Sequence, residues 1–478
     1  MLSAEQAIED LREFQRLLDE ESSYARTTDY DYRSAVGTLL DKFTRRDSVS
    51  DHELYVIYTD ILFSIGDRHS KVYARLNEDA DPNLERRFPL ALANHDNRLL
   101  ALRQTGRLQY GIYDEAYPYL ESIEGMEVNS FLDRYSPRHR TAPVAAKLTR
   151  GAGDLMDIGE LYFGRNEMLP PVLQLVLTDG ERTRPLKFTL TDEGPRYWAI
   201  DREQNAMHAD FVEEAKFDSL LHFLNEEVAY LSIPRMYSFE EFPKLKTTLS
   251  RMAEQLTDAE NLIIDLRYNT GGSRDIIDLL SPYIVPVEQS PWVANVAYVR
   301  TDSTAQRQFD GMAERYLFPY DSGEFDAKDR PAIDRFMQDF RPQRSFDGDQ
   351  FSEPHYMVFR SGPRSFRGHI FLLVNERSFS AASIFASTMK GLNNVTLVGE
   401  TTDGSSGRSQ TKGLPHSGMG IKVSTMLSFQ RNGFPLDGYG TEPDLRIVPD
   451  TTHIFGLRDS QLEAVLDFIE NGYRKAVE

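Results

Sequence analysis

The chain has 478 residues, with 54 lysines and arginines against 75 aspartates and glutamates, which gives a formal net charge of −21. Its apolar content of 40% is ordinary for a folded protein and excludes a disordered chain. A surface this negative repels phosphate backbones and anionic lipids, so nucleic acid and membrane surfaces are not expected partners. The lack of cysteine excludes disulfides, thiol catalysis and cysteine-ligated metals. No apolar run approaches the ~20 residues that an integral membrane segment needs.

Residues 1–85 are predicted to form a helical N-terminal region. Ser3 and Ser50 each begin a helix with capping-box spacing, and apolar stripes follow both of them. Gly66 is a typical signal for the end of the second helix. The segment GDRHSKVYA follows this stop, so His69 lies just beyond the end of a helix.

The rest of the chain divides by its hydrophobic pattern. Residues 86–200 contain short alternating runs separated by turns, which predicts a small β-rich module. Between residues 201 and 450, continuous apolar strands alternate with amphipathic helices, which predicts an α/β core with a largely parallel sheet covered on both faces. A polar, aspartate-rich stretch at about 301–362 is interpreted as an insertion. Residues 451–478 are expected to form a last amphipathic helix.

Two turns that follow buried strands carry the residue types that chemistry needs. DLRYNTGG ends with Gly271 and Gly272 at a helix start, where backbone N–H groups suit an anion or simply make a tight turn. NERSFSAAS puts Ser380 at another helix start, either as a cap or as a nucleophile. Because the carboxyl ends of parallel strands meet at one edge, we expect both turns to open into the same site.

A serine nucleophile needs a base. His69 is one candidate, and His416, in the glycine-rich stretch GLPHSGMG, is its rival; either also fits a surface histidine. No two histidines have the spacing of a zinc site, and the HExxH motif is absent. We therefore expect neither a metal nor an organic cofactor.

In chain order, the segments GDRH, DLRYNTGG, NERSFSAAS, VGETTDGSSG and GYGTEPDLRI resemble the motifs of the C-terminal processing (tail-specific) serine peptidases. The resemblance covers most of the chain and implies a crotonase-like α/β catalytic core, a helical N-terminal region and a PDZ-like module. The segment YPYLESIEGMEVNSFLDR is similar to a stretch of that module. The resemblance also implies a polypeptide substrate and a periplasmic or cell-envelope location with the export signal absent from this chain, while a cytoplasmic location stays open.

The resemblance assigns roles to the residues of both turns. Ser380 matches the nucleophile, and Ser378 matches a cap two residues earlier. The amides of Gly271 or Gly272, together with that of Ala381, match the donors that stabilise the oxyanion.

The base distinguishes two branches of the family. The processing branch carries a lysine in the loop after the VGE strand, and here Lys412 lies beyond the matching position. The tricorn-core-like branch uses a histidine at the position of His69 and a downstream glutamate, for which Glu442 is the candidate. Glu442 or a nearby hydroxyl would orient the imidazole. Arg68 stands where that branch has a supporting serine, although Ser70 is a possible substitute.

Three functions remain open at this point. A serine endopeptidase or carboxyl-terminal processing peptidase is the leading interpretation. A catalytically degenerate peptide- or ligand-binding relative is the alternative, with Arg68 as its main argument. A crotonase-type acyl-CoA enzyme is disfavoured, because such enzymes need neither a serine at this turn nor a β-rich module ahead of the core.

Overall fold

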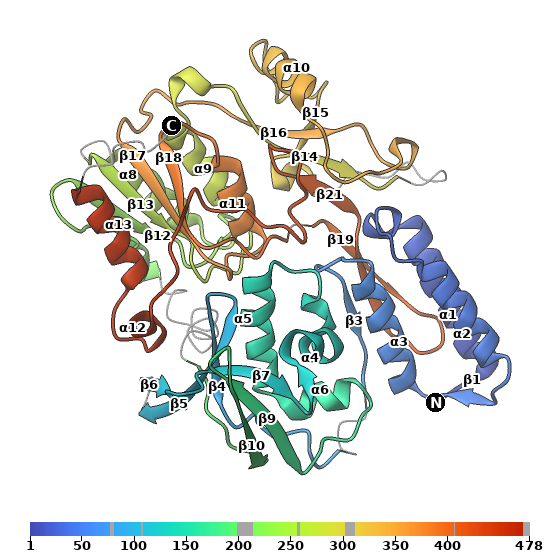
Figure 1. Ribbon diagram of the computed structural model, residues 1–478. Helices are drawn as coiled ribbons and strands as arrows, with labels where there is room; N and C mark the ends of the chain where they lie inside the picture. The colour runs from blue at the N-terminus through green and yellow to red at the C-terminus, as the bar shows by residue number, and fades with distance from the viewer. Residues whose placement is uncertain are drawn as a thin grey trace.

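The computed structural model describes residues 1–76, 81–106, 109–197, 214–255, 259–301, 311–405 and 407–471. It has a mixed α/β fold with a parallel-sheet core; a sheet-and-helix module lies beside this core, and the N-terminal helices pack on a small three-stranded sheet (Figure 1). The end of the predicted β-rich module, residues 198–200, lies outside the described residues. Within them, no helix is both long and apolar enough to cross a membrane.

A six-stranded sheet forms the centre of the core, in the order β11-β12-β13-β17-β18-β22. Neighbouring strands of this sheet pair in parallel, except that β11 pairs antiparallel with β12. Alternate residues of β13 face opposite layers: Leu262 and Ile264 pack with α8, α9 and α11, whereas Ile263 packs with α13. The elements are β11 (Leu221–Phe223), β12 (Val228–Ser232), α8 (Pro243–Gln255), β13 (Asn261–Asp265), α9 (Asp275–Ile284), β17 (His369–Val374), α11 (Ala381–Met389), β18 (Val395–Gly399), β22 (Leu445–Arg446) and α13 (Ser460–Glu470), with the 3₁₀ helix η4 (Glu214–Ser219) ahead of them. The expected alternation of strands and helices is confirmed.

A second, antiparallel sheet in the order β15-β16-β14-β21 flanks the core. The stretch interpreted as an insertion supplies two of its strands and α10, so it is an integral part of this layer. The 3₁₀ helices, the strands and the helix are η6 (Val287–Gln289), β14 (Trp292–Val299), η7 (Ala313–Arg315), β15 (Phe318–Pro319), α10 (Asp329–Asp339), η8 (Gly348–Gln350), β16 (His355–Phe359) and β21 (Met426–Phe429).

The N-terminal region is helical, as expected. Ser3 accepts from the Gln6 amide at 3.2 Å, and the Gln6 side chain accepts from the Ser3 amide at 3.0 Å, so the predicted capping box is confirmed. The elements are β1 (Leu2–Ser3), α1 (Ala4–Glu20), η1 (Tyr24–Arg26), α2 (Tyr32–Phe43), β2 (Ser48–Val49) and α3 (Asp51–Ser64). Gly66 follows α3 with a φ of +86°, a conformation that glycine adopts without strain.

A short strand after Gly66 ties this region to the far end of the sequence. β3 (Lys71–Tyr73) pairs antiparallel with β20 (Gly420–Ser424), which also pairs with β19 (Ser409–Gly413). Figure 1 shows β3 beside α3. The pairing joins the segment that carries His69 to the C-terminal part of the chain.

The module after residue 81 has a seven-stranded sheet, and it also contains three helices, although the sequence predicted a β-rich module. The second, α5, was missed because its two glycines weaken the helical signal. Gly151 allows close packing there, since a Cβ at this position would lie 2.5 Å from the Leu132 side chain of α4, which would have to move. The elements are β4 (Ala91–His95), β5 (Arg98–Gly106), β6 (Gln109–Ile112), β7 (Tyr119–Ile123), β8 (Met126–Glu127), α4 (Val128–Tyr135), η3 (Pro137–His139), α5 (Val144–Leu155), α6 (Ile158–Gly164), β9 (Val172–Thr178) and β10 (Thr183–Thr189).

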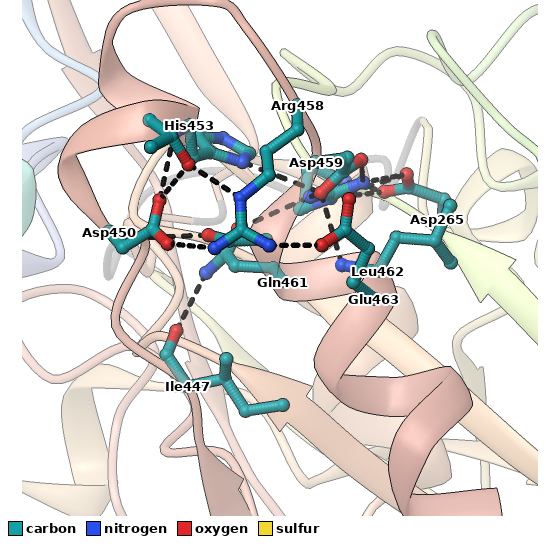
Figure 2. Close-up of polar contacts among 12 residues, drawn as sticks. Asp265, Ile447, Asp450, His453, Arg458, Asp459, Gln461, Leu462 and Glu463 are labelled. Atoms are coloured by element: carbon teal, nitrogen blue, oxygen red, sulfur yellow. Dashed lines mark hydrogen bonds and ion pairs between the residues drawn. The ribbon is translucent and has the colours of Figure 1, made fainter. Parts of the chain in front are cut away.

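An ion-pair cluster anchors the C-terminal helices to the carboxyl end of β13 (Figure 2). Arg267 pairs with Asp265 at 2.7 Å and with Asp459 at 2.6 Å. Asp459 also caps α13 by accepting from the Leu462 amide at 3.0 Å. The short helix α12 (Thr451–Ile454) precedes it. Because Arg267 belongs to DLRYNTGG, the cluster also fixes the start of the Gly-Gly turn.

Candidate functional site

Ser380 occupies a strained position at the start of α11. Its φ of +52° and ψ of −119° lie in a region that non-glycine residues rarely adopt, and such outliers cluster at active sites. Its side chain makes no capping hydrogen bond to the helix, so it does not act as the cap that serines at helix starts usually provide. The hydroxyl is half-exposed on a sharp turn between a parallel strand and a helix, the arrangement that presents serine nucleophiles in other hydrolases.

Buried serines on either side hold this turn. The Ser378 hydroxyl donates to the Leu266 carbonyl at 2.9 Å and accepts from the Asn375 amide at 3.1 Å. The Ser383 hydroxyl donates to the Ser378 carbonyl at 2.6 Å. These two serines therefore have structural roles, and the Ser378 hydrogen bond to Leu266 connects the turn to the end of β13.

The Gly-Gly turn lies directly against Ser380. A Cβ at Gly271 would lie 2.6 Å from the Ser380 Cβ, and the φ of Gly271 is +90°, so only glycine fits. The amide of Gly271 is already occupied, because it donates to the Asn269 side chain at 2.8 Å. The Gly271 carbonyl accepts from the Met236 amide at 3.2 Å. Since the next peptide is trans, the Gly272 N–H points away from Met236.

Two backbone amides remain available beside Ser380. Neither Gly272 N–H nor Ala381 N–H has a hydrogen-bond partner within the described ranges. Met236 follows β12, and Ser380 follows β17 on the other side of β13. Because the Gly272 N–H points away from Met236, it points toward the side of the sheet on which Ser380 lies.

The turn after α3 brings His69 to the same place. Asp67 is buried and accepts from the amides of His69 at 3.1 Å and Ser424 at 2.7 Å, which joins this turn to β20. The His69 ring stacks on Phe379, the residue before Ser380, with 5.2 Å between centroids. No hydrogen bond joins His69 to Ser380 in the part of the chain that the structure describes; in resting enzymes such bonds are often long and tighten only with substrate.

The inner nitrogen of His69 is held by a buried polar chain. Its Nδ1 is hydrogen-bonded to the Ser405 hydroxyl, which donates to Asp437 Oδ1 at 2.7 Å. The Tyr24 hydroxyl donates to the other oxygen of Asp437, and burial together with the Asp437 charge raises the pKa of Tyr24 well above its usual value. Because the single Ser405 proton goes to Asp437, Ser405 accepts from His69. Nδ1 then carries the ring proton, and Nε2 keeps its lone pair.

The other candidates from the sequence lie elsewhere. The Glu442 side chain is exposed, and no contact between Glu442 and His69 exists among the described residues, so the structure gives no support for Glu442 as the partner of His69. Asp444, two residues later, pairs with Leu397 of β18. His416 pairs with Glu9 on α1 at 2.5 Å, and Lys412 is exposed on β19.

Arg68 has a structural partner of its own. It forms a buried ion pair with Asp403, and Arg150 of α5 approaches the same carboxylate at 3.0 Å. Burial alone would raise the pKa of Asp403, but the charges of Arg68 and Arg150 outweigh it and hold the pKa at about 2. The arginine that departs from the family pattern thus binds the loop after β18, and sequence reasoning missed this role because Asp403 is 335 residues away.

A buried pair of carboxyl groups lies where α5 meets the catalytic turns. Thr149 of α5 donates to Glu376 at 2.9 Å, and Glu376 is hydrogen-bonded to Glu400 at the end of β18. Burial and the neighbouring Glu376 raise the pKa of Glu400 to about 9, and burial also raises that of Glu376. At neutral pH the pair therefore keeps a proton.

This pair predicts a dependence of stability on pH. Because the folded state retains a proton that unfolded glutamates release above about pH 4.5, the free energy of unfolding should fall as the pH rises from about 4.5 through about 9. Glu400→Gln keeps a hydrogen bond without the charge. At pH 9 we therefore expect its free energy of unfolding to exceed that of the wild type by at least about 1 kcal/mol, and to have fallen less between pH 6 and pH 9. Urea unfolding at both pH values measures this. Glu442→Gln, at an exposed carboxyl, is the control, and equal pH slopes in all three proteins would refute the shared proton.

Comparison with known proteins agrees with this geometry. Residues 227–447 match the model described as Peptidase family S41. The chain is similar in structure to mature CPAF, with a TM-score of 0.62 and 16% sequence identity over 98% of this chain and 99% of that chain. A structure of mature CPAF complexed with lactacystin gives a TM-score of 0.58 and 15% identity over 98% of both chains. The photosystem II D1 C-terminal processing protease gives 0.43 and 10% identity, over 95% of this chain and 98% of that chain.

The α/β fold and the match to peptidase family S41 indicate a hydrolase of the serine type. The matched part of the chain, residues 227–447, is similar to peptidase family S41, and it carries most of the motifs on which the resemblance rests. The CPAF structures share its fold over nearly the whole length, including the N-terminal region that carries His69.

Proposed function

We propose that this protein cleaves polypeptides by Ser–His catalysis of the tricorn-core-like branch. Ser380 is the nucleophile and His69 the general base. The amides of Gly272 and Ala381 form the oxyanion hole, and Gly271 is the glycine that lets the turn approach Ser380 closely. Ser405 and Asp437 take the positioning role that the sequence suggested for Glu442.

The catalytic steps follow from this arrangement. His69 Nε2 accepts the Ser380 proton as the hydroxyl oxygen attacks the peptide carbonyl carbon. The negative oxygen of the tetrahedral intermediate accepts from the two backbone amides. The carbon–nitrogen bond then breaks, and His69 gives the proton to the leaving amine. Water, deprotonated by His69, hydrolyses the acyl-enzyme and restores Ser380.

The observation that carries this proposal is the meeting of two independent features. One is a serine with a positive φ and no capping bond; the other is a histidine whose outer nitrogen is left with a lone pair by the Ser405–Asp437 chain. Backbone strain lowers the stability of the fold, and residues under such strain cluster at active sites. The engagement of Arg68 with Asp403 removes the main argument for a degenerate relative.

The finer architecture belongs to the same proposal. We take residues 201–450 as a crotonase-like core, 86–200 as a PDZ-like module and 1–85 as the helical region that delivers the base. The C-terminal segment, expected to be one helix over 451–478, forms the two helices α12 and α13 within its described residues. A polypeptide substrate and a periplasmic or cell-envelope location are proposed from the resemblance to the family.

Two matched substitutions test which carboxylate positions His69. Asp437→Asn removes the charge behind Ser405, and kcat/KM for an unfolded protein substrate should fall by about 10²- to 10⁴-fold, as expected for loss of the carboxylate that fixes a catalytic histidine. Glu442→Gln makes the same chemical change at the exposed site and should alter kcat/KM by less than about twofold. Peptide release assays on variants checked by circular dichroism measure both. A large loss for Glu442→Gln with little for Asp437→Asn would restore Glu442 as the partner.

A further inference from the structure

A large cavity lies away from Ser380, between β14, the second half of α10 and the loop after β21. Its volume is about 670 Å³, within the range of ligand-binding sites. Three arginines and three aromatic residues contribute to its wall: Arg335, Arg341, Arg431, Trp292, Phe336 and Phe340. Asp339 is the one acidic residue of the wall, so the cavity is cationic in a chain of net charge −21.

None of the three arginines has an ion-pair partner among the described residues. The Arg341 guanidinium donates to the Phe340 carbonyl at 2.6 Å, and the Arg335 side chain is exposed without a polar contact in the described ranges. Arginine charges on this chain are commonly paired, as at Arg68 and Arg267. Unpaired guanidinium groups around one cavity therefore provide a site for carboxylates, which they bind in a bidentate manner.

Arg431 is held in place for such a contact. Its guanidinium carbon lies 3.7 Å from the centre of the Trp292 ring and 4.9 Å from that of Phe336, and Nη1 donates to the Val293 carbonyl at 2.6 Å. Burial lowers the pKa of Arg431, which reflects a cation removed from water without a compensating anion. Stacking on aromatic faces fixes the plane of the group and leaves other N–H donors for a ligand.

The cavity is linked to the catalytic turn through one helix. Trp292 Nε1 donates at 2.8 Å to the carbonyl of Thr388, which lies eight residues after Ser380 along α11. At 1.5 Å per residue, Thr388 lies about 12 Å from Ser380 along the helix axis, and the cavity lies beyond it on the far side of Trp292. A bound substrate must therefore span more than the ~4 extended residues that cover about 12 Å.

We propose that this cavity is an exosite that binds an acidic segment of a polypeptide substrate. The choice of a polypeptide rests on the proposed peptidase function, whereas the preference for carboxylates rests on the unpaired arginines. The strongly negative surface elsewhere repels acidic chains. A local cationic cavity gives such a substrate one place to dock while its scissile bond reaches Ser380.

Trp292 allows the exosite to be tested directly. The sequence contains two tryptophans, so Trp198→Phe leaves Trp292 as the single reporter, and Ser380→Ala prevents cleavage. We expect an eight-residue peptide of alternating glutamate and glycine to change Trp292 emission saturably, and its glutamine counterpart to bind at least tenfold more weakly. Arg335→Gln should weaken glutamate-peptide binding about five- to tenfold, and added salt should weaken it further. Arg367→Gln, an exposed arginine outside the cavity, is the matched control and should bind like the parent.

Several results would overturn the exosite. They are equal binding of the glutamate and glutamine peptides, equal behaviour of the two arginine variants, and no saturable binding by either fluorescence or calorimetry. Binding of citrate, measured in the same way, tests whether the cavity instead takes small anions. Tighter binding of citrate than of the peptide would overturn the polypeptide assignment. Because these measurements use the Ser380→Ala protein, the absence of peptide binding would contradict the exosite and would not bear on catalysis by Ser380. A failure of Ser380 to react speaks against the proposed function.

Discussion

Replacing Ser380 by alanine is expected to abolish hydrolysis of an unfolded protein substrate, with a loss of about 10⁵- to 10⁶-fold in kcat, because the attacking oxygen is removed. The fold should survive. The Ser380 side chain makes no capping bond, so the free energy of unfolding should change by no more than ~1 kcal/mol. Peptide release measured by mass spectrometry, beside urea unfolding of both proteins, tests the two statements together.

Ser378→Ala is the matched control for this substitution. It removes a buried hydroxyl that joins Leu266 to Asn375, and the Leu266 carbonyl then loses a partner. We expect it to destabilise the fold by about 1–3 kcal/mol while retaining far more activity than Ser380→Ala. Turnover that persists in Ser380→Ala but disappears in Ser378→Ala would assign the nucleophile to the wrong serine.

His69→Ala is expected to have the second largest effect. Without a base, Ser380 keeps its proton, but the amides of Gly272 and Ala381 still stabilise an oxyanion, so a residual acceleration of about 10³-fold over water should remain. Single-turnover assays, with enzyme in large excess over substrate, measure the remaining rate.

His416→Ala and Lys412→Ala are the controls for the choice of base. His416 lies against Glu9 on the N-terminal helices and Lys412 is exposed on β19, so both variants should retain activity close to that of the wild type. If Lys412→Ala removes activity while His69→Ala does not, the protein uses the lysine mechanism of the processing branch.

The sequence allowed the core and half of the site to be predicted, for a physical reason. Apolar strands covered on both faces are continuous runs, and parallel strands bring the turns that follow them to one edge. Gly271, Ser380 and Ala381 lie on such turns, so their meeting follows from topology. His69 was identified by its motif, and the strand β3 that delivers it is only three residues long.

The rest of the site depends on details that no periodicity encodes. Asp437 and Glu442 lie five residues apart in one glycine-rich stretch, and the structure buries Asp437 beside Ser405 while Glu442 is exposed. Likewise, the two glycines of the DLRYNTGG turn look equivalent in the sequence. The side chain of Asn269 occupies the amide of Gly271 and leaves that of Gly272 available. The course of the loop determines which acidic side chain is buried, and competition from side chains determines which backbone amide stays available.

Covalent labelling with a fluorophosphonate probe, followed by peptide mapping, tests the activation of Ser380 most directly. The probe reacts with a serine whose proton can be removed, whatever the physiological substrate. We expect the wild type to carry a single label on the peptide that contains Ser380, with no label in Ser380→Ala and at least tenfold slower labelling in His69→Ala. A folded wild-type protein that stays unlabelled, or a label on another serine, would contradict the account.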